Sequence, residues 1–236
     1  MRLDVLIAIL AAVAFLIWQY RRDRRRLESE RAVLLNDVTE LLDGAELTQE
    51  PMQYPKLRGR YRGHEATIDA VVDNLAVRKV PSLWLRVTIR CDVAFAGSCD
   101  ILARAHNVEF YSPSIGFDHN LRLPGGWPDH LTVKSDDPDR MPPEAFLTPH
   151  VSAFADPKVK ELLVTPRGVR LVYQAAQAAR AEYMVLRQSL FGPVTVPRAL
   201  LISLLDRAVA LAEALQRGAA DAALSPRKAV AEESRR

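Results

Sequence analysis

The chain has 236 residues, of which 49% are hydrophobic and 26% charged, enough for one or two folded domains with a sizeable core. Its net charge of +3 is fully accounted for by residues 1–31, where seven arginines face four acidic residues. The remainder is neutral and lacks the excess of basic residues that nucleic-acid binding needs, so we predict no nucleic-acid partner.

The chain opens with an uncharged apolar run, Val5 to Tyr20, followed at once by a basic cluster at residues 21–26. As a helix, residues 3–20 would reach roughly 27 Å, slightly less than the ~30 Å hydrocarbon core, and long arginine side chains can close that gap. We therefore predict a transmembrane anchor over residues 1–20. The residues expected at the membrane interface are Trp18, Tyr20, Arg21, Arg22, Arg24, Arg25 and Arg26.

The charges on the two sides of this run predict its orientation. Residues 21–26 sum to +4, whereas the amino side carries only the terminal amine, Arg2 and Asp4. The positive-inside rule then places the body of the protein in the cytoplasm. A cleaved signal peptide is the alternative, but the only Ala-x-Ala lies inside the apolar run, at residues 12–14.

Residues 21–44 are predicted to continue as a basic juxtamembrane helix that stops at Gly44. Leucine recurs every seven residues along it, at Leu27, Leu34 and Leu41. Two heptads make a short seam, and two interpretations stay open. The helix packs on its own domain or stands off the membrane, or it forms a homodimer through residues 27–41.

Residues 57–62 and 65–74 are predicted to form a β-hairpin with Gly63-His64 as its two-residue turn. This register sets Arg62, Arg60 and Arg58 opposite Glu65, Thr67 and Asp69, and gathers the apolar residues on the other face. The arginine stripe could bind an anion or RNA. We favour a solvated face that is neutralised by the carboxylates across from it.

The clearest predicted strand is 83–95, where apolar and polar residues alternate. Trp84 falls on the polar side, either as an exposed contact residue or covered by a neighbouring helix. The chain is expected to turn at residues 96–98 and return as a strand over 99–105. Cys91 and Cys99 are expected to be free thiols in a cytoplasmic body.

Residues 112–130 are rich in glycine and proline and break the strand pattern. Because functional residues concentrate in loops, this segment is the first place to expect a site. The alternative is a long connection with a short strand around residues 121–123. The residues of interest are Asp118, His119, Arg122, Trp127 and His130. Their spacing is not that of a metal site, and we predict no metal.

The second half of the chain alternates short elements. We predict a strand over 131–134, helical pieces over 143–156 and a hairpin of residues 160–165 and 168–173 around a type I turn. Residues 176–191 are ambiguous between helix, which their composition favours, and strand.

Pro197 is predicted to open an amphipathic helix that Gly218 ends, leaving residues 219–236 as a disordered tail. The fold class is therefore α+β, with a soluble domain over residues 45–218. It consists of an N-terminal transmembrane helix, an antiparallel sheet built from β-hairpins, and a C-terminal amphipathic helix packed on that sheet.

Motifs of known chemistry are missing from the sequence. It contains no G-x-S-x-G elbow, P-loop, G-x-G-x-x-G or H-E-x-x-H, and no buried pair of carboxylates is evident. We expect no cofactor, and catalysis is the less favoured reading.

The chain resembles, in outline, bacterial single-span membrane-anchored proteins of unassigned function. The stretches that carry the resemblance are VPSLWLRVTI at 80–89, GFDHN at 116–120 and VTPRGVRL at 164–171. The resemblance implies no activity and no site. The location expected from the apolar run and the arginines behind it is the inner membrane, with one span and the soluble domain in the cytoplasm.

These features together favour a membrane-anchored, cytoplasm-facing binding module, an accessory, scaffolding or assembly subunit for other membrane proteins. Its expected partners are the bilayer and those proteins. One alternative is a membrane-tethered enzyme with a site in the 112–130 loop. Another is a sensor of the lipid surface acting through residues 21–26.

Overall fold

The computed structural model describes residues 3–73, 80–93, 95–103, 112–181, 183 and 189–233. Its helical elements are α1 (Leu3–Ala32), η1 (Val33–Leu41), η2 (Pro113–Gly116), α2 (Glu144–Val151), η3 (Ser152–Ala155) and α4 (Arg198–Glu233). Its strands are β1 (Asp43–Thr48), β2 (Lys56–Tyr61), β3 (His64–Val72), β4 (Ser82–Arg90), β5 (Cys99–Leu102), β6 (His119–Leu121), β7 (Thr132–Ser135), β8 (Val159–Thr165) and β9 (Gly168–Gln177).

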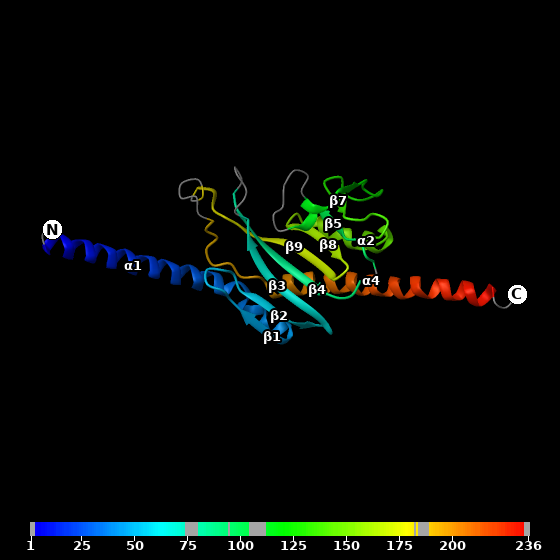
Figure 1. The fold of residues 1–236 in the computed structure, drawn as a ribbon, viewed down its shortest axis with the longest axis horizontal. Coiled ribbons are helices and arrows are strands. Elements are labelled where there is room, and N and C mark those ends of the chain that lie inside the picture. Colours follow the sequence, from blue (N-terminus) through cyan, green and yellow to red (C-terminus); the bar gives the residue numbers. More distant parts are fainter. Residues whose placement is uncertain are drawn as a thin grey trace.

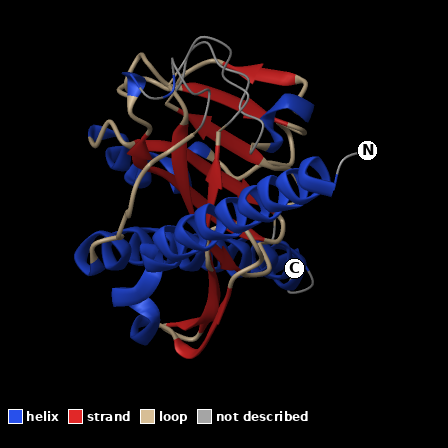
Figure 2. Ribbon diagram, turned by 90° about the vertical axis from the view of Figure 1, so that its left-hand side faces the viewer, coloured by secondary structure: helices blue, strands red, loops and turns tan. Residues whose placement is uncertain are grey.

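The strands form one sheet of nine in the order β1-β2-β3-β4-β9-β8-β5-β7-β6, and every neighbouring pair is antiparallel. The two long helices, α1 and α4, extend beyond the sheet at opposite ends of the molecule (Figure 1). Seen from the α1 end, the strands reach to both sides of these helices (Figure 2). The predicted α+β class is confirmed.

The main core lies between one face of the sheet and α4. In β4 the alternate residues Leu83, Leu85, Val87 and Ile89 are fully buried on this face, as the period-two pattern predicts. The matching stripe of α4 comprises Leu201, Leu204, Leu205, Ala208, Val209, Leu211, Ala212 and Leu215. These positions recur at helical spacing, so α4 buries one face against the sheet, as expected.

α4 does not end at Gly218 but continues as helix to Glu233. Gly218 lies inside the helix because the ring of Phe146 packs where a side chain would otherwise project. A glycine inside a helix costs about 1 kcal/mol relative to alanine, which a helix this long tolerates. This glycine therefore serves helix packing rather than helix termination.

The first hairpin forms, but its predicted register is wrong by two residues. Its turn is Arg62-Gly63, both with positive φ, and Tyr61 pairs with His64. Arg60 therefore lies opposite Glu65 and Arg58 opposite Thr67. A shift of two residues preserves the faces, so Leu57, Ala66 and Ile68 are still buried.

The carboxylates that the hairpin was expected to supply to the arginine stripe bind other arginines instead. Asp69 binds Arg86 of β4 with two hydrogen bonds, at 2.8 and 2.6 Å, and Glu65 lies 3.8 Å from Arg90. Arg62 reaches α4, where its Nη2 lies 2.9 Å from the Oδ1 atom of Asp206.

The second hairpin is confirmed, since Thr165 pairs with Gly168 across a two-residue Pro166-Arg167 turn. The return strand after β4 is placed differently from the prediction. β5 pairs with β7 and β8 rather than with β4, because β9 occupies the edge of β4. β7 and the helical pieces α2 and η3 form close to their predicted positions.

The juxtamembrane segment is shorter as a helix than predicted. α1 ends at Ala32, η1 follows, and an additional strand, β1, begins at Asp43 where a helix stop and a linker were expected. Leu34 and Val38 are buried in the core of the domain, and Leu41 packs against it. Two of the three repeat leucines, Leu34 and Leu41, therefore pack on their own domain, as one of the two interpretations held.

Residues 176–191 combine both of their predicted states where they are described. β9 continues to Gln177, and residues 180, 181 and 183 are helical. Residues 178–179 and 189–191 are neither helix nor strand, and positions 182 and 184–188 lie outside the described residues.

Candidate membrane-proximal site

α1 is the one helix in the described chain that is long and apolar enough to cross a membrane; a signal sequence passes the same test of length and composition. Its large apolar side chains are exposed, namely Leu3, Val5, Leu6, Ile7, Ile9, Leu10, Val13, Phe15, Leu16 and Ile17. A core helix of a soluble domain would bury such residues. The apolar half of α1 also stands clear of the sheet (Figure 1).

The predicted interface residues lie where the exposed apolar stretch ends. Trp18 packs its ring near Phe15, with centroids 5.9 Å apart, and the guanidinium of Arg22 lies 5.6 Å from the Trp18 ring centroid. Arg24 and Arg26 form ion pairs one helical turn on, with Glu28 at 3.0 Å and Glu30 at 2.8 Å. Within the described chain, the other three arginines of the cluster, Arg21, Arg22 and Arg25, make no ion pair.

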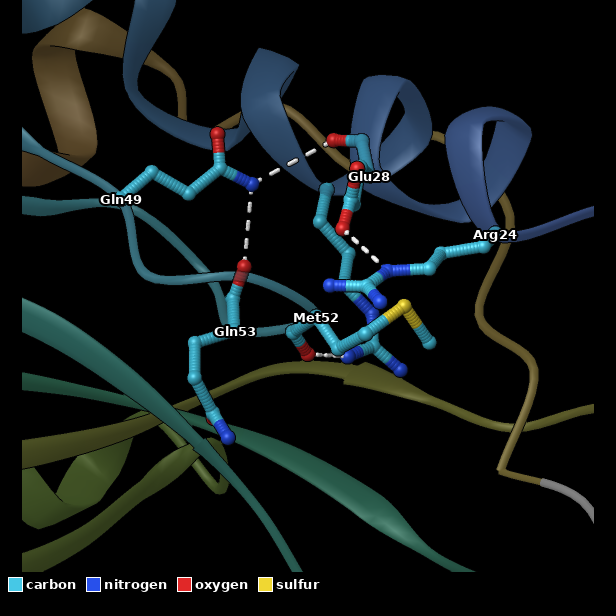
Figure 3. A network of polar contacts seen from close by, with 6 residues as sticks. Arg24, Glu28, Gln49, Met52 and Gln53 are labelled. Carbon is cyan, nitrogen blue, oxygen red and sulfur yellow. Dashed lines mark hydrogen bonds and ion pairs between the residues drawn. The ribbon is translucent and has the colours of Figure 1, made fainter. Parts of the chain in front are cut away.

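The end of α1 is held to the domain by the loop between β1 and β2 (Figure 3). The Gln49 side-chain amide donates to the carbonyls of Glu28, at 3.3 Å, and of Gln53, at 3.0 Å. Arg31 donates to the carbonyl of Met52, and its guanidinium lies 5.3 Å from the Tyr54 ring centroid. These contacts join the helical stem to the sheet.

A hollow of about 720 Å³ lies beside this stem. It is lined by Tyr20, Asp23, Arg24, Arg26, Leu27 and Glu30 of α1, by Met52, and by Leu190, Gly192 and Pro193 from the segment before α4. A second hollow, of about 490 Å³, shares Leu27, Met52 and Leu190 with it and extends to Tyr54 and to Ala70–Val72 of β3. Charged groups of both signs and an apolar floor therefore meet at the base of the membrane helix.

The polar residues singled out in the 112–130 loop lie on the surface of the domain. Asp118, His119, Arg122 and His130 are all exposed, and no hydrogen bond or ion pair joins them in the described structure. Among the described residues, no group of three or more histidine, cysteine, aspartate or glutamate side chains could hold a metal ion.

The two tryptophans proposed as contact residues are both buried. Trp84 is 0% exposed and packs with Val172 and Val71 on the sheet face opposite α4, where its Nε1 donates to Asp73 Oδ2 at 3.4 Å. Trp127 belongs to the main core, and its Nε1 donates to the Thr148 hydroxyl at 3.1 Å. Of the two possibilities for Trp84, the exposed contact residue is therefore wrong, and Trp127 is not an exposed contact residue either.

The structure contains two buried carboxylates, Asp100 of β5 and Glu161 of β8. The sequence analysis did not predict a buried pair of acidic residues. Both are 0% exposed. Asp100 pairs with Leu163, so Glu161 is its diagonal neighbour on the sheet face opposite α4. The Ser112 hydroxyl donates to Asp100 Oδ2 at 2.6 Å, whereas Asp100 Oδ1 and both Glu161 oxygens have no hydrogen-bond partner among the described residues.

Burial raises the pKa of Asp100 to about 6, opposed by the hydrogen bond from Ser112. Burial, and then the charge of Asp100, raise the pKa of Glu161 well above its ordinary value. Two like charges in one apolar site oppose each other's ionisation, which adds to the effect of burial on Glu161. The positive charge of Arg170 of β9, which donates a hydrogen bond to the Thr88 hydroxyl at 3.3 Å, opposes this rise in the pKa of Glu161.

Neither carboxylate carries a sequence signal of its own. Each is a single acidic residue in a short apolar strand, and the opposing strand that brings them together is 61 positions away. Asp100 lies between the buried apolar residues Cys99 and Ile101, a pattern that could have marked it, whereas Glu161 follows Lys160 and lacks that pattern.

Comparison with known proteins gives little. No family model matches the sequence, and no curated protein matches it. Among solved structures, the chain is similar to the mycobacterial trehalose monomycolate transport factor A, TtfA, with 13% identity and a TM-score of 0.37, covering 81% of this chain and 93% of that chain. A likeness at this level carries no argument about what the chain binds.

Proposed function

We propose that this protein is a single-span, membrane-anchored binding module whose sheet domain faces the cytoplasm and acts as an accessory, scaffolding or assembly subunit for other proteins of the inner membrane. The observation that carries the proposal is α1. Its apolar side chains are exposed over about five turns, and the helix continues without a break into a basic stem that holds the domain.

The continuity of α1 favours an anchor over a cleaved signal peptide. Residues 3–32 form one helix, and Glu28 and Arg31 at its end contact the loop between β1 and β2. Cleavage within or after the apolar run would remove or shorten the element to which that loop is attached. The excess of arginine after the apolar run supports a cytoplasmic domain.

A pair of reporter fusions tests the orientation. Alkaline phosphatase, which is active only in the periplasm, and green fluorescent protein, which matures in the cytoplasm, are each fused after Arg236. We expect fluorescence without phosphatase activity. Replacing all five arginines of residues 21–26 with glutamine should weaken that preference. Phosphatase activity from the unmodified chain would contradict the cytoplasmic assignment.

Cross-linking in intact membranes tests the accessory role. The full chain is cross-linked, extracted in mild detergent and compared with a matched chain in which residues 3–20 are replaced by an unrelated apolar span. We expect the same membrane proteins to be captured by both, because the domain, rather than the span, recognises them. A chain that is always recovered alone would contradict an accessory role.

A further inference from the structure

The hollow beside the α1 stem lies where the apolar part of the helix ends, and it combines guanidinium, carboxylate and phenol groups. We propose that it binds the headgroup of an anionic phospholipid that carries hydroxyl groups, of the phosphatidylglycerol class. The inference rests on the proposed function in one respect, namely that α1 stands in a bilayer.

The position of the hollow fits the headgroup layer of the membrane. The α1 residues that line it recur at helical spacing from Tyr20 to Glu30, which covers roughly 15 Å along the helix axis. Tyr20 is the last residue of the uncharged run. The interfacial layer of a bilayer is roughly 5–8 Å thick on each side, so the first turns of this face lie within it.

The phosphate would be bound by Arg24 and Arg26. Their present partners, Glu28 and Glu30, are neighbours one turn away, and the arginine side chains are 40% and 79% exposed. Exposed pairs of this kind are weak and are easily exchanged for a phosphate, which arginine binds with two parallel hydrogen bonds. Arg21, Arg22 and Arg25 keep the surroundings of the hollow positive.

The carboxylates distinguish this hollow from a general basic patch. Asp23 and Glu30 line the same wall, and Asp23 forms no ion pair in the described structure. A carboxylate repels phosphate but accepts hydrogen bonds from hydroxyl groups, which the glycerol of phosphatidylglycerol supplies. Leu27, Met52, Leu190 and Pro193 offer an apolar floor to the glycerol backbone and the first methylene groups of the acyl chains.

Native mass spectrometry of the delipidated full chain in detergent tests the inference. Short-chain phosphatidylglycerol, phosphatidylethanolamine and phosphatidic acid are added separately. We expect phosphatidylglycerol to bind best. The double variant Arg24→Gln/Arg26→Gln should lose binding by roughly tenfold or more, the effect of losing a charged hydrogen bond. Asp23→Asn should abolish the preference over phosphatidic acid.

The matched control is Arg21→Gln/Arg25→Gln, which removes the same charge from positions that do not line the hollow. It should retain binding within about twofold. Equal losses in the two double variants would overturn the inference in favour of diffuse charge attraction. Equal or better binding of phosphatidylethanolamine would overturn it in favour of a zwitterionic ligand.

Alkaline extraction of membranes, run in parallel, separates the two proposals. A chain that stays in the membrane pellet but binds none of the three lipids contradicts the lipid site alone. A chain that leaves the pellet contradicts the membrane anchor itself, whatever it binds in detergent.

Discussion

At the scale of single residues, the most unusual feature is the pair of buried carboxylates on the sheet face opposite α4. A buried acidic group whose pKa is raised takes up a proton on folding, so it lowers the stability of the fold as the pH rises. The pKa values of Asp100 and Glu161 are both raised, so both groups lower the stability as the pH rises. Ser112, next to η2, supplies the only hydrogen bond from a described residue to the pair.

We predict that the free energy of unfolding falls as the pH rises from 3.8, the ordinary pKa of aspartate, through the raised pKa of Asp100, about 6, and falls further above it until Glu161 has ionised, by up to ~1.4 kcal/mol per pH unit for each proton taken up on folding. Glu161→Gln should flatten this dependence and stabilise the protein at pH 8, because an amide mimics the protonated acid. The melting temperatures of the full chain and of the variant, taken in detergent at several pH values, measure this pH dependence. Glu65→Gln, at an exposed position, is the control and should leave the pH dependence unchanged.

At the scale of elements, the two hairpins are set by turns whose glycines meet different constraints. Gly63 has φ +82° and open space around it. Gly168 has φ +141°, and a side chain there would overlap the carbonyl of Ile89 in the adjacent strand β4. Gly125 has neither constraint. The loss of folding stability caused by adding a side chain should therefore be smallest at Gly125, larger at Gly63 and largest at Gly168.

We predict that Gly125→Ala changes stability by less than about 0.5 kcal/mol, that Gly63→Ala destabilises by about 1 kcal/mol, and that Gly168→Ala destabilises by more than about 2 kcal/mol. Thermal unfolding of the three variants in one detergent measures the order. If Gly63→Ala and Gly168→Ala had equal effects, the close approach of β4 and β9 at Gly168 would be contradicted.

The long helix α4 depends on Gly218 in a different way. The Phe146 ring that packs against this glycine also lies 5.9 Å from the Phe95 ring, measured between centroids. An alanine at position 218 gains about 1 kcal/mol of helix propensity but must displace that ring.

We predict that Gly218→Ala destabilises the protein by about 1–2 kcal/mol despite its better helix propensity. Phe146→Leu should cost stability alone, yet the double variant should lose less than the sum of the two. Chemical denaturation of all four proteins gives the coupling energy. A zero coupling energy would show that the ring does not oppose a side chain at position 218.

At the scale of the whole molecule, the chain divides into an exposed apolar helix and a folded sheet domain joined by the α1 stem. The apolar side chains of residues 3–17 are exposed, so they contribute nothing to the core. The stem and η1, by contrast, are held by Gln49, by Arg31 and by the backbone bond from Val196 N to Leu34 O at 3.0 Å. Membrane association and domain stability should therefore respond to different substitutions.

We predict that Leu10→Arg, at the centre of the apolar run, weakens membrane insertion by about 3 kcal/mol and leaves the melting temperature of the domain unchanged. Leu34→Ala, inside the core, should do the reverse, destabilising the domain by about 2–5 kcal/mol while the chain stays in the membrane. Fractionation of membranes and thermal unfolding measure the two effects separately. A lowered melting temperature for Leu10→Arg would contradict this independence.

The features that the sequence determined by itself are those that depend on a local pattern of apolar, polar and turn residues. The apolar run before residues 21–26, the period-two pattern of β4, the Thr165–Gly168 turn and the apolar stripe of α4 each depend on neighbours within a few positions. Local steric preferences and the need to bury one face determine the type of such an element, whatever its position in the fold. The faces of the first hairpin survived even a wrong register, because a slip of two residues returns each side chain to the same side.

Only the tertiary structure decided which strands became neighbours and what covered each face. β9 rather than β5 pairs with β4, Trp84 is buried, and Phe146 occupies the space beside Gly218. The same long-range pairing brings Asp100 beside Glu161 and places Leu190 against the α1 stem. The reason is physical: these contacts join residues tens to more than a hundred positions apart, and no local pattern encodes which distant surface will pack against a given face.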